Sequence, residues 1–484
     1  MLIRDSMIYI VAKLLAGTIG MATTALLTRL LDPGSYGMYG LALVIMTFGS
    51  TMVFDWLGVS FLRFYEGLHD NPLMFSTFVQ IFLMLLAGTA LMAVLAWLCG
   101  MLAARDASII GAGVLMMWSF SWFELASYFE IAEFHPDRYM TMNAGRGLFV
   151  LMGAGTAAWA THSPFWTAIG TAVGTACGAL LGGFRRWSLG PAHFDRDLAR
   201  GILVFGLPLA VSMALAGMVN SGTRVLLEEL DSARALGLYT AAFMLVQNTI
   251  NLASAGIASA SYQLAVHAVE SGDSRAVHRQ LIANGTLLLA VIAPAALGMV
   301  LTAHGIATTL VGSEFVPVVT VLTPWMAASA FFGCLRSHYL DHAFQLGRRP
   351  SLQIEVTAVA AVVGLGLSIA LIPRLGAVGA AIATTVAMAV SCVHALIAGR
   401  GAFPLPVPIA GGARVLVACL VMAAVVLCIP ERGLASFVAR IAAGGISYAT
   451  VALALDVLSL RSSAWRAVRR LAIAGHASPA GPVS

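Results

Sequence analysis

"TRLLDPGSYGMYGLAL", residues 28–43, ends one apolar run of the chain and begins the next, and residues 226–243, "LLEELDSARALGLYTAAF", repeat this pattern. In both copies a short polar turn separates the two runs. A Gly-x-Tyr then opens the second run, at Gly37 in the first copy and at Gly237 in the second. The two glycines lie two hundred residues apart. We infer that the first half of the chain recurs in its second half.

The composition of the chain is that of a membrane protein. Of its 484 residues 60% are hydrophobic and only 10% are charged, with a mean hydropathy of +0.90, whereas soluble domains carry about 25% charged residues. The charged residues fall in short breaks between apolar runs of about 20 residues or more, the length that crosses the hydrocarbon as a helix. Lipid offers the backbone no hydrogen-bonding partner, and the runs do not alternate, so we predict an all-α integral membrane protein.

The apolar runs predict about fourteen transmembrane helices. They lie near residues 7–31, 37–61, 75–101, 108–132, 139–161, 164–184, 200–227, 235–265, 280–303, 315–342, 351–372, 376–398, 411–430 and 434–457. Six spans, an even number, separate the two copies of the motif, so both copies have the same orientation. This arrangement predicts two six-helix lobes related by an axis along the membrane normal, followed by two C-terminal helices.

The repeat also predicts the division of the chain. The parts are an N-lobe over residues 1–184, a cytoplasmic linker over 185–200, a C-lobe over 201–400, two additional transmembrane helices over 401–460 and a basic, disordered cytoplasmic tail over 461–484. The linker, "RRWSLGPAHFDRDLAR", is the most charged of the cytoplasmic loops. Its position between the two repeats supports the division.

The distribution of arginine predicts that both termini face the cytoplasm. In that orientation sixteen arginines fall on the cytoplasmic side and five on the outer side. This agrees with the excess of Lys and Arg that cytoplasmic loops of membrane proteins carry. Topology therefore accounts for most of the formal net charge of +5, and we predict no nucleic-acid partner.

Four segments share their order and spacing with a known family. They are "LLTRLLDPGSYGMYGLAL" at 26–43, "FLRFYEG" at 61–67, "LGLYTAAFMLVQNTINLASAGIASASYQ" at 236–263 and "QLGRRPSLQIEVTAVAAVVGLGLSIALIPRLGAVGAAIATTVA" at 345–387. Over nearly its whole length the chain resembles the polysaccharide transporter family, which includes the Wzx-like oligosaccharide flippases. That family belongs to the multidrug, oligosaccharidyl-lipid and polysaccharide exporter (MOP) superfamily.

The resemblance implies a transporter and not an enzyme. Its substrate would be a polyprenyl-pyrophosphate-linked oligosaccharide repeat unit, flipped by alternating access from the cytoplasmic to the periplasmic leaflet of the bacterial inner membrane. The product would serve exopolysaccharide, capsule or O-antigen synthesis, with a polysaccharide polymerase and export machinery as further partners. No cofactor is expected apart from a coupling H⁺ or Na⁺, and the chain has no phosphate-cradling loop for ATP hydrolysis.

Two other functions were weighed against the flippase. The alternative is a cation-coupled drug or metabolite antiporter of the same superfamily and fold. A membrane-bound polymerase or glycosyltransferase is disfavoured, because such enzymes need a long outer loop with catalytic side chains and the predicted outer connections are short.

Such a substrate needs cations and polar groups inside the bilayer, where a central charge costs at least about 2.5 kcal/mol. The candidate phosphate and sugar ligands are Lys13, Arg63, Arg146, Arg224, Gln247, Asn248 and Asn251. We hypothesise that Arg63, Arg146 and Arg224 mark successive phosphate or sugar-acid positions from inside to outside. Helix packing is the other explanation for polar faces of membrane helices.

Two acidic residues within the spans, Asp55 and Glu124, are candidates for binding a coupling H⁺ or Na⁺. Structural ion pairing explains the intramembrane charges equally well. The pairs would be Lys13–Asp55, Arg146–Glu124 and Arg336–Glu355.

One pair of histidines has the spacing of metal ligands. His338 and His342 lie at i and i+4 on one helix face, with Asp341 between them. No third ligand is evident nearby. We therefore expect interfacial histidines at a cytoplasmic helix end, and we predict no metal site.

Overall fold

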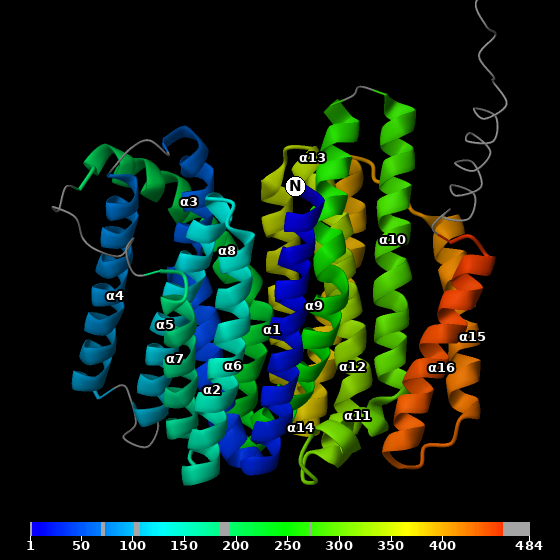
Figure 1. Cartoon of the computed structure of the whole chain (residues 1–484), viewed down its shortest axis with the longest axis horizontal. Helices are drawn as coiled ribbons and strands as arrows, with labels where there is room; N and C mark the ends of the chain where they lie inside the picture. The colour runs from blue at the N-terminus through cyan, green and yellow to red at the C-terminus, as the bar shows by residue number, and fades with distance from the viewer. Residues whose placement is uncertain (1, 69–72, 101–106, 184–193, 271–272, 458–484) are drawn as a thin grey trace, which may run out of the picture.

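The computed structural model describes residues 2–68, 73–100, 107–183, 194–270 and 273–457. They form a bundle of helices whose axes are roughly aligned with one another (Figure 1). Within these residues the regular structure is helical and includes no strand. Ten of the described helices are long and apolar enough to cross a membrane. The predicted all-α membrane class is confirmed, whereas the count of fourteen spans stays a prediction.

The N-terminal group of helices packs around α2 and α6. Its members are α1 (Leu2–Leu30), α2 (Pro33–Val53), α3 (Asp55–Leu68), α4 (Met74–Leu98), α5 (Ala107–Ala132), α6 (Pro136–Thr161) and α7 (Pro164–Leu180). α6 packs along α1 and α7, and α2 packs along α5. In Figure 1, α4 lies at the outer margin of this group.

The C-terminal group joins the first group through α8 and α9. Its members are α8 (Arg196–Leu230), α9 (Ala233–Glu270), α10 (Ser274–Leu301), α11 (Ala303–Leu310), α12 (Val316–Leu335), the π-helical turn η2 (Arg336–Leu340), α13 (His342–Leu346) and α14 (Pro350–Ala402). α2 contacts both α8 and α9, and α1 contacts α9. The interface between the two groups is therefore formed mainly by these four helices.

Two further helices, α15 (Ile409–Cys428) and α16 (Gly433–Ala454), pack on each other and on α10. They lie at the edge of the bundle opposite α4 (Figure 1). The division of the chain into lobes stays a prediction, because most of the predicted linker and the tail from residue 458 lie outside the described residues. Of the linker, the structure describes residues 194–200, where α8 begins at Arg196.

The span predicted near residues 37–61 is interrupted. α2 ends at Val53, Phe54 has a φ of −120°, and α3 begins at Asp55. A kink in a helix needs an identifiable local cause, and here the hydroxyls of Ser50 and Thr51 on the last turn of α2 donate to the Asp55 carboxylate. Hydropathy does not mark this break, since apolar residues continue on both sides of it.

One further predicted boundary agrees with the structure and one differs. α14 (Pro350–Ala402) is broken at Gly376, between the spans predicted near 351–372 and 376–398, and the φ of 56° there suits glycine because a side chain would be strained. The span predicted near 315–342 continues to Leu346 through the π-helical turn η2. The π-helical turn does not change the hydropathy of the segment, so the sequence pattern did not reveal it.

The start of α2 is stabilised by Asp32. Its carboxylate accepts hydrogen bonds from the backbone N–H groups of Gly34, at 2.8 Å, and Ser35, at 3.1 Å, while Pro33 occupies the first turn. This is a side-chain N-cap followed by a proline that needs no hydrogen-bond acceptor. In the second copy of the motif the hydroxyl of Ser232 accepts from the N–H of Ala235 at 3.2 Å, so α9 begins with a cap of a different residue type.

We expect Asp32→Ala to lower the free energy of unfolding by about 1 kcal/mol, the usual value of an N-cap. Hydrogen bonds from Ser35 and the nearby backbone amides hold the pKa of Asp32 below its ordinary value. The stabilisation is therefore complete at neutral pH and is lost as the pH falls through the folded-state pKa. Thermal unfolding of the detergent-solubilised protein measures this, with Asp32→Asn as the control that keeps a cap without a charge. A gap between wild type and Asp32→Ala that does not narrow in acid would contradict the assignment.

Candidate functional site

The two copies of the sequence motif touch each other. A Cβ atom placed on Gly37 would lie 1.7 Å from the carbonyl oxygen of Ala233, and one placed on Gly237 would lie 1.9 Å from the carbonyl oxygen of Pro33. The backbones of α2 and α9 are therefore in direct contact at these two residues, and only glycine permits this approach. We call this pair the glycine contact, and we call the end of the bundle where it lies the glycine end.

Further contacts join the two groups at the glycine end. Tyr36 of α2 packs edge-on against the ring of Phe315, with ring centroids 5.7 Å apart. Arg29 at the end of α1 donates to the carbonyl oxygen of Thr309 at 2.5 Å. A Cβ on Gly312 would lie 2.1 Å from the carbonyl oxygen of Thr28, so the backbone is close-packed here as well. The glycine end of the bundle is thus closed, and the predicted topology makes it the outer end.

The acidic residue Asp55 is held within the N-terminal group. Ser50 donates to one carboxylate oxygen at 2.8 Å, and Thr51 donates to the other at 2.9 Å. Ser121 of α5 in turn donates to the Ser50 hydroxyl at 3.0 Å. These hydrogen bonds hold Asp55 at the break, because Ser50 and Thr51 lie on the last turn of α2 and Asp55 is the first residue of α3.

Arg146 and Glu124 lie in the same region. The guanidinium of Arg146 stacks 4.6 Å from the ring centre of Phe123 and 5.5 Å from that of Phe120. Gly178 of α7 leaves the room for it, since a Cβ there would be 2.5 Å from the Cβ of Arg146. Glu124 interacts electrostatically with Arg146, although the two side chains, both of which the structure describes, form no direct ion pair.

Lys13 lies between the two groups of helices. Its side chain is exposed, and its charge acts both on Glu124 of the N-terminal group and on His338 of the C-terminal group. The direct pair of Lys13 with Asp55 that the sequence allowed is not formed, since the hydrogen bonds of Asp55 come from hydroxyls. Lys13 therefore faces the space from which a substrate would approach both groups.

The C-terminal group encloses a cavity of about 290 Å³, which we call the C-group cavity. Its polar lining consists of Tyr239, Gln247, Ser329, Arg336, Ser337, His338 and Thr384. Phe243, Met326 and Met388 supply apolar walls. The cavity thus offers hydroxyl, amide, guanidinium and imidazole groups beside aromatic and thioether surfaces, a lining that can bind a polar ring with an apolar face.

The predicted amide cluster divides between different environments. Gln247 lines the C-group cavity. Asn248 lies instead against α1, since a Cβ on Gly20 would be 3.3 Å from its amide nitrogen. The backbone of Asn251 belongs to α9, but its side chain lies outside the described part of the structure.

The three arginines of the phosphate hypothesis lie in three separate places. Arg63 is exposed on α3 and stacks 4.3 Å from the ring centre of Phe205 on α8. Arg224 is 3% exposed and lies behind the cavity wall, with its guanidinium 4.8 Å from the ring centre of Phe243. Together with Arg146 they form no single cluster. Their order from the cytoplasmic to the outer side stays a prediction, as does their role.

Sequence reasoning missed the role of one segment, η2. It brings Arg336, Ser337 and His338 together in the wall of the C-group cavity. Glu355, considered as a partner of Arg336, pairs with His394 at 3.4 Å instead. Among the described residues no group of three or more His, Cys, Asp or Glu side chains could hold a metal ion, the histidine pair included. Only the polar composition of residues 336–338 could have drawn attention to the segment.

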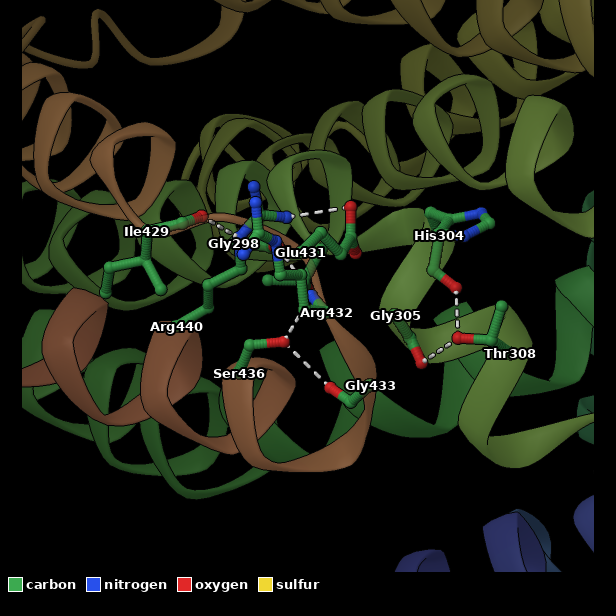
Figure 2. Close-up of polar contacts among 11 residues, drawn as sticks. Gly298, His304, Gly305, Thr308, Ile429, Glu431, Arg432, Gly433, Ser436 and Arg440 are labelled. Carbon is green, nitrogen blue, oxygen red and sulfur yellow. Dashed lines mark hydrogen bonds and ion pairs between the residues drawn. The ribbon is translucent and has the colours of Figure 1, made fainter.

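A second cavity, of about 400 Å³, lies between α9, α10 and the α15–α16 pair. Its lining is mostly apolar and includes Met299, Leu310 and Phe437, with Arg440 in the wall. Figure 2 shows how Arg440 is held: one guanidinium nitrogen pairs with Glu431 at 2.9 Å, and Nε donates to the carbonyl oxygen of Ile429 at 2.9 Å. Because these contacts use the charge of Arg440 within the α15–α16 pair, the cavity remains an apolar site.

Comparisons with solved structures agree with this fold. The structure is similar to one described as the lipid II flippase MurJ in an inward closed conformation, with a TM-score of 0.77, 12% identity, and coverage of 93% of this chain and 99% of that chain. It is also similar to an inward-facing multidrug resistance MATE family transporter of the MOP superfamily, with a TM-score of 0.64, 12% identity, and coverage of 82% and 97%. An outward-facing structure of such a transporter gives a TM-score of 0.57 at 11% identity, with coverage of 82% and 95%.

Sequence comparisons assign the chain to a protein family. No curated protein matches the chain. The family described as polysaccharide biosynthesis protein matches residues 26–320, more than half of the chain, and this stretch includes both copies of the glycine motif. With a fold similar to these transporters and this family match over more than half of its length, the chain belongs to the polysaccharide biosynthesis protein family.

Proposed function

We propose that the protein is a flippase for polyprenyl-pyrophosphate-linked oligosaccharide repeat units, which it moves from the cytoplasmic to the periplasmic leaflet of a bacterial inner membrane. The observation that carries this proposal is the pairing of two unlike cavities. The C-group cavity is polar and contains the guanidinium of Arg336, while the cavity beside α15 and α16 is apolar. A substrate with a charged glycan head and a hydrocarbon tail needs both kinds of surface.

The closed glycine end supports alternating access as the mechanism. The two groups of helices meet closely at Gly37 and Gly237, so a rigid-body movement about this end would expose the space around Lys13 to one side of the membrane at a time. In the predicted topology the glycine end is the periplasmic end, and the opposite end of the bundle faces the cytoplasm. The glycan would enter there, and the polyprenyl chain would stay in lipid or in the apolar cavity.

Energy coupling is the least constrained part of the proposal. Asp55 and Glu124 are our candidates for binding H⁺ or Na⁺, since both are carboxylates within the membrane helices and Glu124 lies near the cations Arg146 and Lys13. Release of the ion in the opposite state would then drive the return of the empty protein. An unchanged transport rate after collapse of both ion gradients would exclude this role.

The proposal is tested with vesicles that contain only the purified protein. A lipid-linked oligosaccharide in the lumenal leaflet is expected to become accessible to an external glycosidase, while a trapped cationic dye is retained. Efflux of the dye without movement of the oligosaccharide would favour the antiporter of the same fold. Vesicles without protein control for spontaneous movement of the lipid.

We expect replacement of Arg63, Arg146 and Arg224 together by alanine to lower the flipping rate at least about tenfold, since each hydrogen bond to a charged group contributes about 1.5–3 kcal/mol. The readout is the initial rate in the same vesicles, at equal amounts of inserted protein. Replacement of Arg279 and Arg400, which are exposed at helix ends, gives a control with two charges removed elsewhere. A wild-type rate in the triple variant would refute the phosphate role of all three residues.

A further inference from the structure

Arg336 lies in the wall of the C-group cavity, and one of its N–H groups has no hydrogen-bond acceptor in the described structure. One guanidinium nitrogen, Nη1, donates to the hydroxyl of Thr357 at 3.0 Å. The Nε atom is buried and has no hydrogen-bond partner. Asp341 acts on Arg336 electrostatically, but Arg336 makes no ion pair with a carboxylate of the described residues. A buried donor left unpaired costs about 1–3 kcal/mol, so an adjustment of the Arg336 side chain that brings Nε to an acceptor in this cavity would be favourable.

The π-helical turn explains why Arg336 faces the cavity together with its neighbours. Residues two apart on a regular α-helix do not face the same side. Here the N–H of Asp341 donates to the carbonyl oxygen of Arg336, five residues back, at 2.9 Å, and the wider turn presents residues 336–338 to one cavity. Single π-turns inside α-helices occur frequently at functional sites. The turn therefore concentrates one guanidinium, one imidazole and one hydroxyl on a single surface.

The surroundings add positive charge and neutral hydrogen-bonding groups. Lys13 of α1 acts electrostatically on His338 from across the space between the two groups of helices. Gln247 and Ser329 line the same cavity from α9 and α12. The volume of about 290 Å³ lies at the lower limit of ordinary ligand sites, which measure about 300–1,000 Å³. One sugar residue or one phosphate group matches this space better than a whole repeat unit does.

We propose that the C-group cavity is a subsite for one anionic group of the transported substrate, with Arg336 as its principal ligand. The anion is either the carboxylate of an acidic sugar or a phosphate of the carrier lipid. Gln247, Ser329 and Ser337 hydrogen-bond the neutral oxygens around it. This inference rests on the proposed flippase function and adds a ligand that lies outside the three arginines Arg63, Arg146 and Arg224.

Two synthetic substrates distinguish the two sources of the anion. Both are polyprenyl-pyrophosphate-linked trisaccharides of equal length, one with a glucuronic acid residue and one neutral, and each is presented to vesicles of the full-length protein below saturation. Arg336→Gln is expected to lower the initial flipping rate of the acidic substrate about tenfold to a hundredfold, the effect of losing hydrogen bonds to a charged group. Arg336→Lys, which keeps the charge, is expected to retain most of the rate.

The neutral substrate identifies the bound group. A loss of less than threefold for the neutral substrate assigns the subsite to the sugar carboxylate, and an equal loss for both substrates assigns it to the pyrophosphate. An unchanged rate for both substrates overturns the proposal while leaving the flippase function intact. If the wild-type protein flips neither substrate, the proposed function itself fails, and the subsite proposal falls with it.

A second variant covers the case in which Arg336→Gln does not fold. A Cβ on Gly333 would meet only the sulfur of Met388, at 3.8 Å, and Gly333 lines the cavity, so Gly333→Leu fills part of the cavity and leaves Arg336 in place. We expect the same selective loss of rate from this filling of the cavity. Gly366→Leu on α14 is the matched control, because a Cβ there meets nothing within 4 Å. Equal rates for the Gly333 and Gly366 variants would count against the subsite.

Discussion

Gly237→Ala is expected to open the glycine end of the bundle and to stop net transport. The added Cβ would lie 1.9 Å from the carbonyl oxygen of Pro33, a backbone atom that no side-chain rotation can move away. α2 and α9 must then separate. Inserting a group into a well-packed contact costs about 1–3 kcal/mol, which shifts the equilibrium away from the closed state about tenfold to a hundredfold.

The opening is measured by the accessibility of a cysteine at the same end. Ser35→Cys, in a background in which the exposed Cys99 and Cys428 are replaced by alanine, is reacted with a membrane-impermeant maleimide. We expect labelling at least about tenfold faster when Gly237→Ala is present. Gly366→Ala, which places its Cβ in open space, is the control and is expected to leave the labelling rate unchanged.

The reciprocal substitution provides an internal check. Gly37→Ala would place a Cβ 1.7 Å from the carbonyl oxygen of Ala233, so it is expected to have the same effect. Because both substitutions open one contact, the double variant should be no more accessible than the stronger single variant. Normal labelling and normal transport in either single variant would show that the end is closed by other contacts, such as Tyr36 with Phe315.

Glu124→Ala is expected to destabilise the N-terminal group by about 2.5 kcal/mol, the cost of an uncompensated central charge in a membrane helix. Glu124 is the carboxylate whose charge acts directly on Arg146 and Lys13, while the Asp55 carboxylate already accepts two hydrogen bonds from hydroxyls. Without Glu124 the charge of Arg146 is balanced only by the faces of the Phe120 and Phe123 rings. Thermal unfolding in detergent, followed by tryptophan fluorescence, measures the loss.

The double variant separates a structural role of Arg146 from a role in transport. Glu124→Ala with Arg146→Met removes both charges, so the stability is expected to return close to that of the wild type. If the recovered protein also transports normally, Arg146 serves only to balance Glu124. If it is stable but inactive, at least one of Arg146 and Glu124, the candidate for the coupling ion, acts in transport. No recovery of stability would mean that the two charges do not compensate each other.

The sequence predicted the class of the fold because the bilayer permits few solutions. Long apolar runs without alternation must be helices in lipid, and the structure confirms an all-helical chain with ten helices able to cross a membrane. The break at Phe54 was not predictable from hydropathy, since a kinked helix and a straight one of equal length bury similar side chains, whereas the break at Gly376 falls between two predicted spans. Two hydroxyls that donate to the Asp55 carboxylate stabilise the first break, and the second occurs at a glycine with a positive φ.

The candidate site was predicted only in part. The sequence singled out Lys13, Gln247 and Glu124, and the structure places Lys13 between the two groups of helices and Gln247 in the C-group cavity. The structure places Arg63, Arg146 and Arg224 in three different environments, and it places Asn248 against α1. A helical period assigns a residue to one side of its own helix, but the neighbour on that side depends on how the helices cross.

The repeat shows most clearly that the sequence predicts positions along the chain but not which helices contact each other. The sequence by itself determined that Gly37 and Gly237 are equivalent positions, because each opens a helix after a short polar turn in a parallel repeat. Only the tertiary structure decided that these equivalent positions meet, and that residues 336–338 share one cavity wall through a π-helical turn. The physical reason is that hydropathy and turn residues act locally along the chain, whereas close contact between distant backbones depends on the packing of both groups of helices at once.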